Sequence, residues 1–262
     1  MKKVLYIFLF IAASGFAQPK FNRVAEIEIA VDFFTTDNQS NVYVVSGDQL
    51  IKYDKAGKQL CKYSNKNLGK ISYVDASNML KILVFYGEFS QVIFLDNTLS
   101  INGEPISFDK LGFQQAQLAC VSHNNGMWVY DQQNFSLTQL SLTNEKVHQT
   151  TNINNSVEVE LQPTGMIEYN NNVYLNNPAS GILIFDIYGT YYKTIPIKNL
   201  KKFQPTGDWV YFKENSTLKA YNIKTTEEQQ FTLPLSDFID LDRKSTRLNS
   251  SHSDRSRMPS SA

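Results

Sequence analysis

The sequence contains few of the residues that metal, redox and nucleophilic sites require. Among 262 residues there are 3 His and 2 Cys, and neither a glycine-rich phosphate loop nor a G-x-S-x-G nucleophile motif occurs. His123 and His148 fall in different predicted strands without a cysteine at ligand spacing, so we interpret both as structural or surface residues. Cys61 and Cys120 occupy non-equivalent positions of different repeat units, which favours two free thiols. We therefore expect no cofactor.

The whole chain has no excess of positive or negative charge, because 25 Lys and Arg balance 25 Asp and Glu. This balance combines three different parts. The first 17 residues carry two lysines and no acid, and the last 21 carry five basic and two acidic residues. The middle of the chain, residues 18–241, is left with 18 basic and 23 acidic residues, a net charge of −5. A mildly acidic body argues against nucleic acid as a partner.

No apolar run reaches the ~20 residues that a membrane-spanning helix needs, so we expect no transmembrane segment. Residues 1–17 are instead typical of a secretory signal peptide. A basic start and an apolar stretch at residues 4–13 precede the small residues Gly15 and Ala17. This pattern predicts cleavage near Ala17/Gln18. The mature protein is then expected to be periplasmic or secreted.

The composition changes abruptly at residue 242, where Ser and Arg begin to dominate. Residues 242–252 and 256–262 resemble the two arms of a translated sequencing adapter in a single reading frame. We interpret residues 242–262 as an adapter-derived, disordered tail. The natural sequence is then expected to continue differently after Leu241.

Between these ends lies a repeated all-β pattern. Turn residues recur roughly every 8–12 positions and no helical periodicity is sustained. Units of about 40 residues with this pattern predict a β-propeller of four-stranded antiparallel blades, six in number with the last one truncated. The blades are predicted at residues 31–65, 71–108, 116–151, 164–198 and 203–234, with a sixth begun at residue 237, all within one domain of residues 18–241.

Residues 41–60 are the clearest unit. Gly47 is predicted to take a positive φ in the tight turn between the second and third strands. The next turn contains Asp54, whose side chain is expected to accept bonds from the backbone that follows, and Gly57 in a left-handed conformation. Residues 24–30 form a further alternating strand. We expect that strand to complete the last blade and so remove an exposed edge.

Three quoted stretches carry a resemblance to a known family. NVYVV with SGDQLIKYDKAGK, NVYLN with GILIFDIYGT, and DWVYF with TLKAYNIKT resemble blades of NHL-type and related TolB-like six-bladed propellers. Blade two departs from the pattern because its second strand lacks the tyrosine, and blade three because no glycine follows the turn at Asp131. The resemblance implies a rigid scaffold whose loops and central funnel bind something, but a fold alone carries no activity.

The predicted innermost strands and one turn supply the candidate site residues. Asp32, Asp75 and Glu168 could converge in the funnel as oxygen ligands for calcium. Tyr188, Tyr191 and Tyr192 flank a turn and could form a contact patch for peptide or glycan. Each of these residues also has an ordinary structural interpretation, as a loop carboxylate or as packing between blades.

The sequence favours a non-catalytic function. We expect an exported, monomeric β-propeller that acts as a binding scaffold in the cell envelope, with a protein or peptide/glycan partner. The alternative is a metal-dependent propeller hydrolase or lyase, similar to lactonases, with its site in the funnel.

Overall fold

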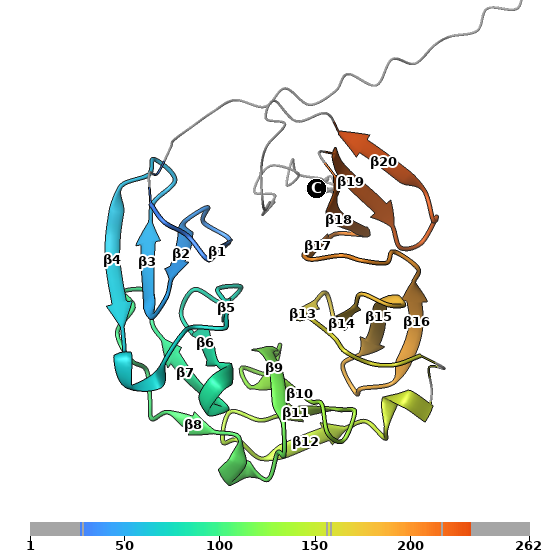
Figure 1. Cartoon of the computed structure of the whole chain (residues 1–262), viewed down its shortest axis with the longest axis horizontal. Helices are drawn as coiled ribbons and strands as arrows, with labels where there is room; N and C mark the ends of the chain where they lie inside the picture. Colours follow the sequence, from blue (N-terminus) through green and yellow to red (C-terminus); the bar gives the residue numbers. More distant parts are fainter. Residues whose placement is uncertain (1–26, 28, 156, 158, 216, 232–262) are drawn as a thin grey trace, which may run out of the picture.

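The computed structural model describes residue 27, residues 29–155, residue 157, residues 159–215 and residues 217–231. These residues form five antiparallel sheets of four strands, arranged as blades around a common axis (Figure 1). The expected all-β propeller of four-stranded blades is therefore confirmed, with five blades in this part of the chain. The predicted signal peptide, the start of a sixth blade at residue 237 and the tail from residue 242 lie outside the described residues.

Within each blade the strands follow one another in sheet order from the innermost to the outermost. Blade one contains β1 (Phe33–Thr36), β2 (Val42–Ser46), β3 (Gln49–Tyr53) and β4 (Gln59–Ser64). Blade two contains β5 (Tyr73–Asp75), β6 (Ile82–Tyr86), β7 (Gln91–Leu95) and β8 (Ile106–Ser107). Blade three contains β9 (Ala116–Val121), β10 (Met127–Asp131), β11 (Ser136–Leu140) and β12 (Lys146–Gln149).

Blade four contains β13 (Gly165–Tyr169), β14 (Asn172–Asn177), β15 (Gly181–Asp186) and β16 (Tyr191–Ile195). Blade five contains β17 (Phe203–Thr206), β18 (Trp209–Glu214), β19 (Thr217–Asn222) and β20 (Glu228–Phe231). Four short 3-10 helices connect strands, namely η1 (Lys66–Leu68), η2 (Gly87–Phe89), η3 (Asp109–Leu111) and η4 (Ile153–Asn155). None of the helices in the described residues is long and apolar enough to cross a membrane.

The core lies between blades rather than within them. Successive side chains of a strand point to opposite faces of its sheet, so one strand serves two interfaces. In β10, Met127 and Val129 pack toward blade two, whereas Trp128 and Tyr130 pack toward blade four. This explains why the second and third strands read as almost continuous apolar runs, as expected for sheets buried on both faces.

The turn between the third and fourth strands is built in the same way in blades one to four, and blade five has a related turn that is one residue longer. Asp54 accepts hydrogen bonds from the backbone N–H groups of Ala56 and Lys58, both at 2.9 Å, and Gly57 takes a φ of 82°. The equivalent residues that accept such bonds in the other blades are Asp96, Ser141, Asp186 and Asn222. The expected roles of Asp54 and Gly57, and the positive φ of Gly47 at 61°, are confirmed.

The interpretation of blade three was wrong in one respect. Asp131 is the last residue of β10 and therefore belongs to the turn between the second and third strands. The residue that matches Asp54 is Ser141, which follows β11 and whose hydroxyl accepts from the backbone N–H of Thr143 at 3.2 Å and of Glu145 at 3.1 Å. A serine can cap this turn as an aspartate does, so the aspartate alone was a misleading marker.

Blades one and five lie at the two ends of the row of described blades (Figure 1). On the face of blade one away from blade two, Val44, Ile51 and Tyr53 form a small apolar cluster. Ile27 and Ile29 pack against this cluster but lie outside any strand. The idea that residues 24–30 complete the last blade stays a prediction, because the other part of that segment lies outside the described residues.

Candidate functional site

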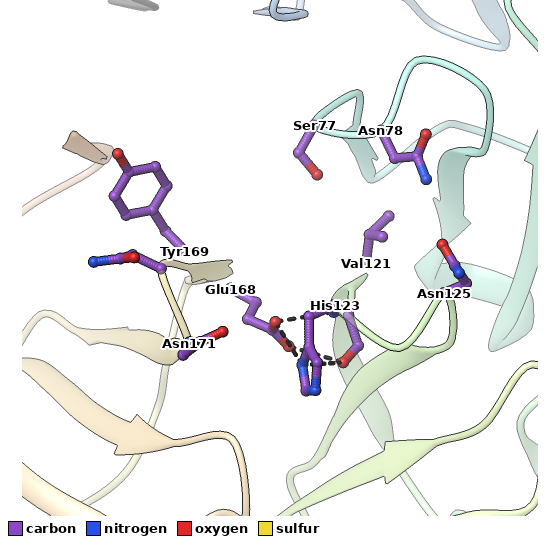
Figure 2. A pocket seen from close by; sticks show the side chains of 10 residues that line it. Ser77, Asn78, Val121, His123, Asn125, Glu168, Tyr169 and Asn171 are labelled. Atoms are coloured by element: carbon purple, nitrogen blue, oxygen red, sulfur yellow. Dashed lines mark hydrogen bonds and ion pairs between the residues drawn. The ribbon is translucent and has the colours of Figure 1, made fainter. Parts of the chain in front are cut away.

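The innermost strands of blades two, three and four end near one another at one end of the axis around which the blades are arranged, a place we call the funnel mouth (Figure 1). A pocket of about 290 Å³, lined mostly by residues with polar side chains, lies there. Figure 2 shows Ser77, Asn78 and Asn125 on one side of it and Tyr169 and Asn171 on the other. The full lining is Ser77, Asn78, Val121, Ser122, His123, Asn125, Glu168, Tyr169, Asn170 and Asn171.

The topology brings these residues together. Every lining residue lies at the end of an innermost strand or in the turn that follows it, since β5, β9 and β13 end at Asp75, Val121 and Tyr169. The strands have equivalent places in successive blades, so their ends meet at the same mouth of the funnel. Segments separated by more than 40 residues in sequence are thereby joined into one site.

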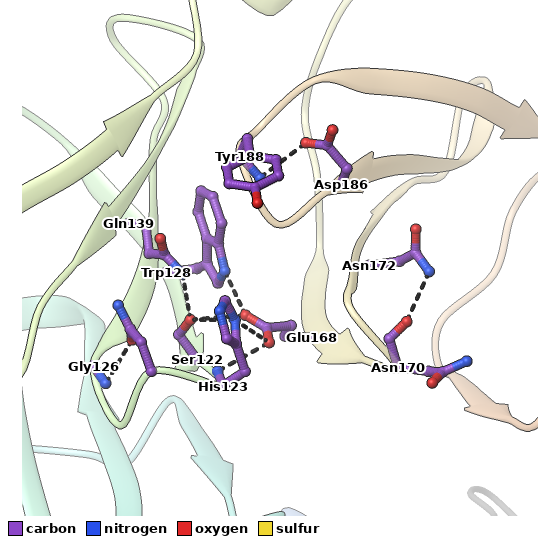
Figure 3. A network of polar contacts seen from close by, with 11 residues as sticks. Ser122, His123, Gly126, Trp128, Gln139, Glu168, Asn170, Asn172, Asp186 and Tyr188 are labelled. Carbon is purple, nitrogen blue, oxygen red and sulfur yellow. Dashed lines mark hydrogen bonds and ion pairs between the residues drawn. The ribbon is translucent and has the colours of Figure 1, made fainter.

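Glu168 of β13 is the centre of a hydrogen-bond network between blades three and four (Figure 3). Its side chain is only 5% exposed. Oε1 accepts from the backbone N–H of His123 at 2.9 Å and pairs with Nδ1 of the same residue at 2.9 Å. Oε2 accepts from Ser122 Oγ at 2.8 Å and from Trp128 Nε1 at 2.6 Å.

Four donors fill the acceptor capacity of this carboxylate. A carboxylate offers two oxygens with about two lone-pair directions each, and each oxygen of Glu168 already takes two donors. Gln139 Nε2 donates to Ser122 Oγ at 2.7 Å, which directs the hydroxyl proton of Ser122 toward Glu168. The geometry therefore makes Glu168 a positioning group rather than an open ligand.

His123 lies between this network and the pocket. Because a carboxylate only accepts, the Nδ1 atom of His123 must carry a proton to bond to Glu168. In the neutral ring this leaves the lone pair on Nε2. The side chain of His123 is 39% exposed and lines the pocket. His123 can thus accept a hydrogen bond or a proton at the pocket wall.

Asp75 of β5 holds the same end of β9 from the other side. Its Oδ2 accepts from the backbone N–H of Val121 at 3.0 Å and its Oδ1 from that of Ser77 at 2.9 Å. Three consecutive residues, Val121, Ser122 and His123, are therefore bound by carboxylates from both neighbouring blades. Tyr73 Oη, two residues before Asp75, donates to the carbonyl of Met166 in β13 at 3.1 Å. This hydrogen bond joins the innermost strands of blades two and four directly, although blade three lies between these blades in sequence.

Four polar side chains at the pocket have no hydrogen-bond partner within the described part of the chain: Ser77, Asn125, Asn170 and Asn171. Asn125, Asn170 and Asn171 have left-handed backbones with φ of 63°, 48° and 61°. Asn170 and Asn171 form the two-residue loop between β13 and β14, since Tyr169 pairs with Asn172. Positive φ at both positions is typical of a type I′ turn, which tolerates asparagine well. The turn thus presents two free amides at the funnel mouth.

The three predicted funnel carboxylates do not occupy one place. Asp32 precedes the first residue of β1, at the start of an innermost strand, and its Oδ2 accepts from the backbone N–H of Gly47 at 2.6 Å. Asp75 and Glu168 lie at or near the ends of their strands. Among the residues that the structure describes, no group of three or more His, Cys, Asp or Glu side chains could hold a metal ion.

The three predicted contact tyrosines have different surroundings. Tyr188 is 61% exposed and meets the ring of His148 edge-on at 5.2 Å between centroids. Tyr192 is 70% exposed, with Lys193 Nζ 5.4 Å from its ring centre. Tyr191 instead packs on Phe185 at 5.8 Å. Neighbours along a strand point to opposite faces, so these tyrosines do not make one patch.

Sequence reasoning missed most of the pocket. His123 was interpreted as structural or surface, and Ser77, Asn125, Asn170 and Asn171 were not considered as site residues. The run of asparagines at 170–172 after a strand was the one available signal, because asparagine at a tight turn keeps a polar side chain where glycine would have none. Both cysteines are free, with Cys120 buried and Cys61 half-buried.

Comparison with solved structures places this fold among propellers of different function. Streptogramin B lyase shares 13% identity over 77% of this chain and 68% of that chain, with a TM-score of 0.53. Catalytically inactive virginiamycin B lyase from Staphylococcus aureus, with quinupristin, shares 11% identity over 77% of this chain and 69% of that chain, with a TM-score of 0.54. The WD40 domain of Pan2 from Neurospora crassa shares 10% identity over 75% of this chain and 63% of that chain, with a TM-score of 0.55. Such identities show the fold alone. Neither protein-family models nor curated protein sequences give a match.

Proposed function

We propose that this protein is a non-catalytic binding scaffold that holds a ligand or partner in the pocket at the funnel mouth. One observation carries the proposal: four polar side chains without partners in the described residues face a pocket whose wall is fixed by Glu168 and Asp75. A rigid wall with free polar groups lowers the ordering cost of binding. The partner is a protein, peptide or glycan.

The proposal includes export to the cell envelope. Its support is the signal-like pattern of residues 1–17, and the mature chain is then a monomer in the periplasm or outside the cell. Expression in a bacterium, fractionation and N-terminal sequencing test this. A periplasmic or secreted chain that begins at Gln18 is expected. A chain that stays in the cytoplasm with Met1 at its start contradicts it.

We also propose that the complete ring has six blades, as in NHL-type and TolB-like propellers. Two features support this. The face of blade one away from blade two carries the cluster of Val44, Ile51 and Tyr53, next to a largely apolar pocket of about 380 Å³. The face of blade five away from blade four carries an apolar cluster that includes Leu218 and Ala220. A further blade between these faces would pack against both clusters.

Binding at the pocket is tested with two matched tryptophan variants. Ser77→Trp fills the pocket, whereas Glu104→Trp adds the same side chain in an exposed loop of blade two. Each protein is immobilised and exposed to envelope extract. The expected result is one defined component retained by the wild type and by Glu104→Trp, and lost in Ser77→Trp. Equal retention by all three, or no retention by any, contradicts the proposal.

A hydrolase or lyase is the second candidate, favoured by one observation. His123, held by Glu168 through Nδ1, keeps Nε2 available as a base at the pocket. The metal-dependent form of this candidate has little support, because Glu168 has no free acceptor direction for a cation. Metal analysis and thermal unfolding in the presence of EDTA distinguish the binding scaffold from a metal-dependent enzyme. The binding proposal expects unchanged melting, and a fall in melting temperature with stoichiometric calcium or zinc would favour the metalloenzyme.

A further inference from the structure

We propose that the ligand of the funnel-mouth pocket is a neutral carbohydrate, a glycan end or a short oligosaccharide. The inference rests on the proposed function, in which this pocket binds a ligand, and it adds the chemical class. Charge, the type of free polar group, and pocket size each point to that class.

The pocket offers no open charge to a ligand. The carboxylate of Glu168 is filled by four donors, as described above, and Asp75 is buried with both oxygens on backbone N–H groups. The neighbouring cation Lys81 donates to the carbonyl of Asn125 and lies 4.1 Å from the ring centre of Phe94. A phosphate or carboxylate ligand would meet two buried negative charges and a cation already in use.

The side-chain groups that remain available to a ligand are neutral, and most of them can both donate and accept hydrogen bonds. Each side-chain amide of Asn125, Asn170 and Asn171 has two donor hydrogens and an acceptor oxygen, and the hydroxyl of Ser77 both donates and accepts. Nε2 of His123 adds an acceptor. Sugar hydroxyls are likewise donor and acceptor at once, so a ring with several hydroxyls can use all five groups together. A cation can use only the acceptor atoms of these groups, and an anion can use only their donor hydrogens.

The exposed lining of the pocket is about half polar and half apolar. Pockets for drug-like and lipid ligands are mostly apolar, whereas a sugar ring has both hydroxyl groups and C–H surface. The hydroxyl of Tyr169 accepts from the backbone N–H of Gly207 at 2.7 Å, which fixes the ring at the rim. At about 290 Å³ the pocket is at the lower end of the ~300–1,000 Å³ of typical ligand sites, which fits one or two sugar rings.

The test is a titration of the whole chain with named probes. Cellobiose, maltose and N,N′-diacetylchitobiose are the carbohydrates; inorganic phosphate, citrate and spermidine are the charged probes; a neutral Gly-Ser peptide is the polar non-sugar. The indole N–H resonance of Trp128 reports binding, because this group bonds to Glu168 behind the pocket wall. Trp209, in blade five, is the reference signal.

Asparagine-to-aspartate variants locate the binding. Asn171→Asp keeps the shape and the tolerance for a left-handed backbone, but it replaces two donors by a charge. Asn144→Asp is the matched control, since Asn144 is also left-handed, with φ of 63°, but lies in the outer turn of blade three. We expect at least one carbohydrate to shift the Trp128 signal, with affinity about ten-fold or more weaker in Asn171→Asp and unchanged in Asn144→Asp.

The outcomes separate the two levels of the proposal. If the peptide or a charged probe binds in a manner that depends on Asn171 and no carbohydrate does, the carbohydrate class is wrong but the pocket remains a binding site. If Asn171→Asp leaves carbohydrate binding unchanged, the sugar binds elsewhere and the inference fails. If no probe binds and Ser77→Trp also leaves retention from envelope extract unaltered, both the class and the proposed function fail.

Discussion

Two buried carboxylates in this propeller accept four hydrogen bonds each, but from very different parts of the chain. Asp37, in the turn after β1, accepts from the backbone N–H groups of Gln39 and Asn41, from Asn41 Nδ2 and from Tyr43 Oη. All of these donors lie within six residues of Asp37. The donors of Glu168 lie 40 to 46 residues away, in the neighbouring blade.

The difference separates local from architectural use of the same chemistry. Asp37 shapes one turn of blade one, and its bonds form as soon as that hairpin forms. Glu168 joins blade four to blade three, so its bonds exist only when both blades are in place. A change at Glu168 should therefore affect the interface and the pocket together. A change at Asp37 should act first on the turn of blade one, which also meets blade two through a hydrogen bond from Asn38 Nδ2 to the carbonyl of Ser77 at 3.3 Å.

The largest expected effect is that of Glu168→Ala. The buried donors of Ser122 and Trp128 lose their acceptor, and an unsatisfied donor costs about 1–3 kcal/mol. We expect the free energy of unfolding to fall by about 3–5 kcal/mol, measured by urea denaturation. Asp37→Ala is the matched control, with a smaller loss and an intact network around Glu168. A loss below that of Asp37→Ala would contradict the comparison.

Trp128→Phe tests one bond of the network while most of the ring volume is retained. The side chain of Trp128 is fully buried, and hydrogen bonds to charged groups contribute about 1.5–3 kcal/mol. We expect the free energy of unfolding to fall by about 2–3 kcal/mol, including lost packing. Trp209→Phe in blade five serves as the control for loss of an indole. Equal losses in the two variants would show that the bond to Glu168 adds nothing.

Asp37→Asn tests the local carboxylate through pH. Burial alone would raise the pKa of Asp37, but hydrogen bonds from the side chain and backbone of Asn41, the backbone of Gln39 and Tyr43 hold the pKa below its usual value. A lowered pKa stabilises the fold above the unfolded value of about 3.9, and this contribution is lost as pH falls through the folded pKa.

Wild type should therefore exceed Asp37→Asn in stability by about 1–2 kcal/mol at neutral pH, and the difference should shrink below about pH 4. Unfolding curves at several pH values measure this. A difference that is independent of pH would mean that the charge of Asp37 is not involved.

The smallest expected effect is that of Asn171→Gly in the two-residue turn. Glycine adopts a positive φ without the steric cost of a Cβ atom, so the variant should be more stable by at most about 1 kcal/mol. It should bind the pocket ligand more weakly, because an amide is lost. Thermal unfolding and the Trp128 titration give the two values. A lower stability of Asn171→Gly together with an unchanged affinity for the ligand would contradict the role given to Asn171.

Local features could be predicted from the sequence, and contacts between blades could not. The turn at Asp54 was predicted because its donors follow within four residues. Asp32, Asp75 and Glu168 were grouped because all three belong to innermost strands. The alternating pattern of a strand does not tell which residues lie at its start and which at its end, and Asp32 lies at the start of its strand whereas Asp75 and Glu168 lie at or near the ends of theirs. Tyr191 and Tyr192 were grouped by sequence distance, although a strand turns consecutive side chains to opposite faces.

The Glu168 network was invisible for a related reason. Its members, Ser122, His123, Trp128 and Glu168, share no sequence motif, and only the packing of blade four on blade three brings them together. The register of each blade against the next depends on side chains such as Met166 and Cys120 fitting at the interface. That fit is a property of three-dimensional packing, which no pattern along one blade contains.

The most direct test of the central claim is the tautomer of His123, measured by nitrogen NMR on protein labelled at its histidines. If Glu168 positions this ring at the pocket wall, the neutral imidazole carries its proton on Nδ1 and leaves Nε2 free, and the signal changes in Glu168→Ala. His148, which meets Tyr188 at the outer rim, provides the reference. A neutral ring with its proton on Nε2 in the wild type would contradict the account.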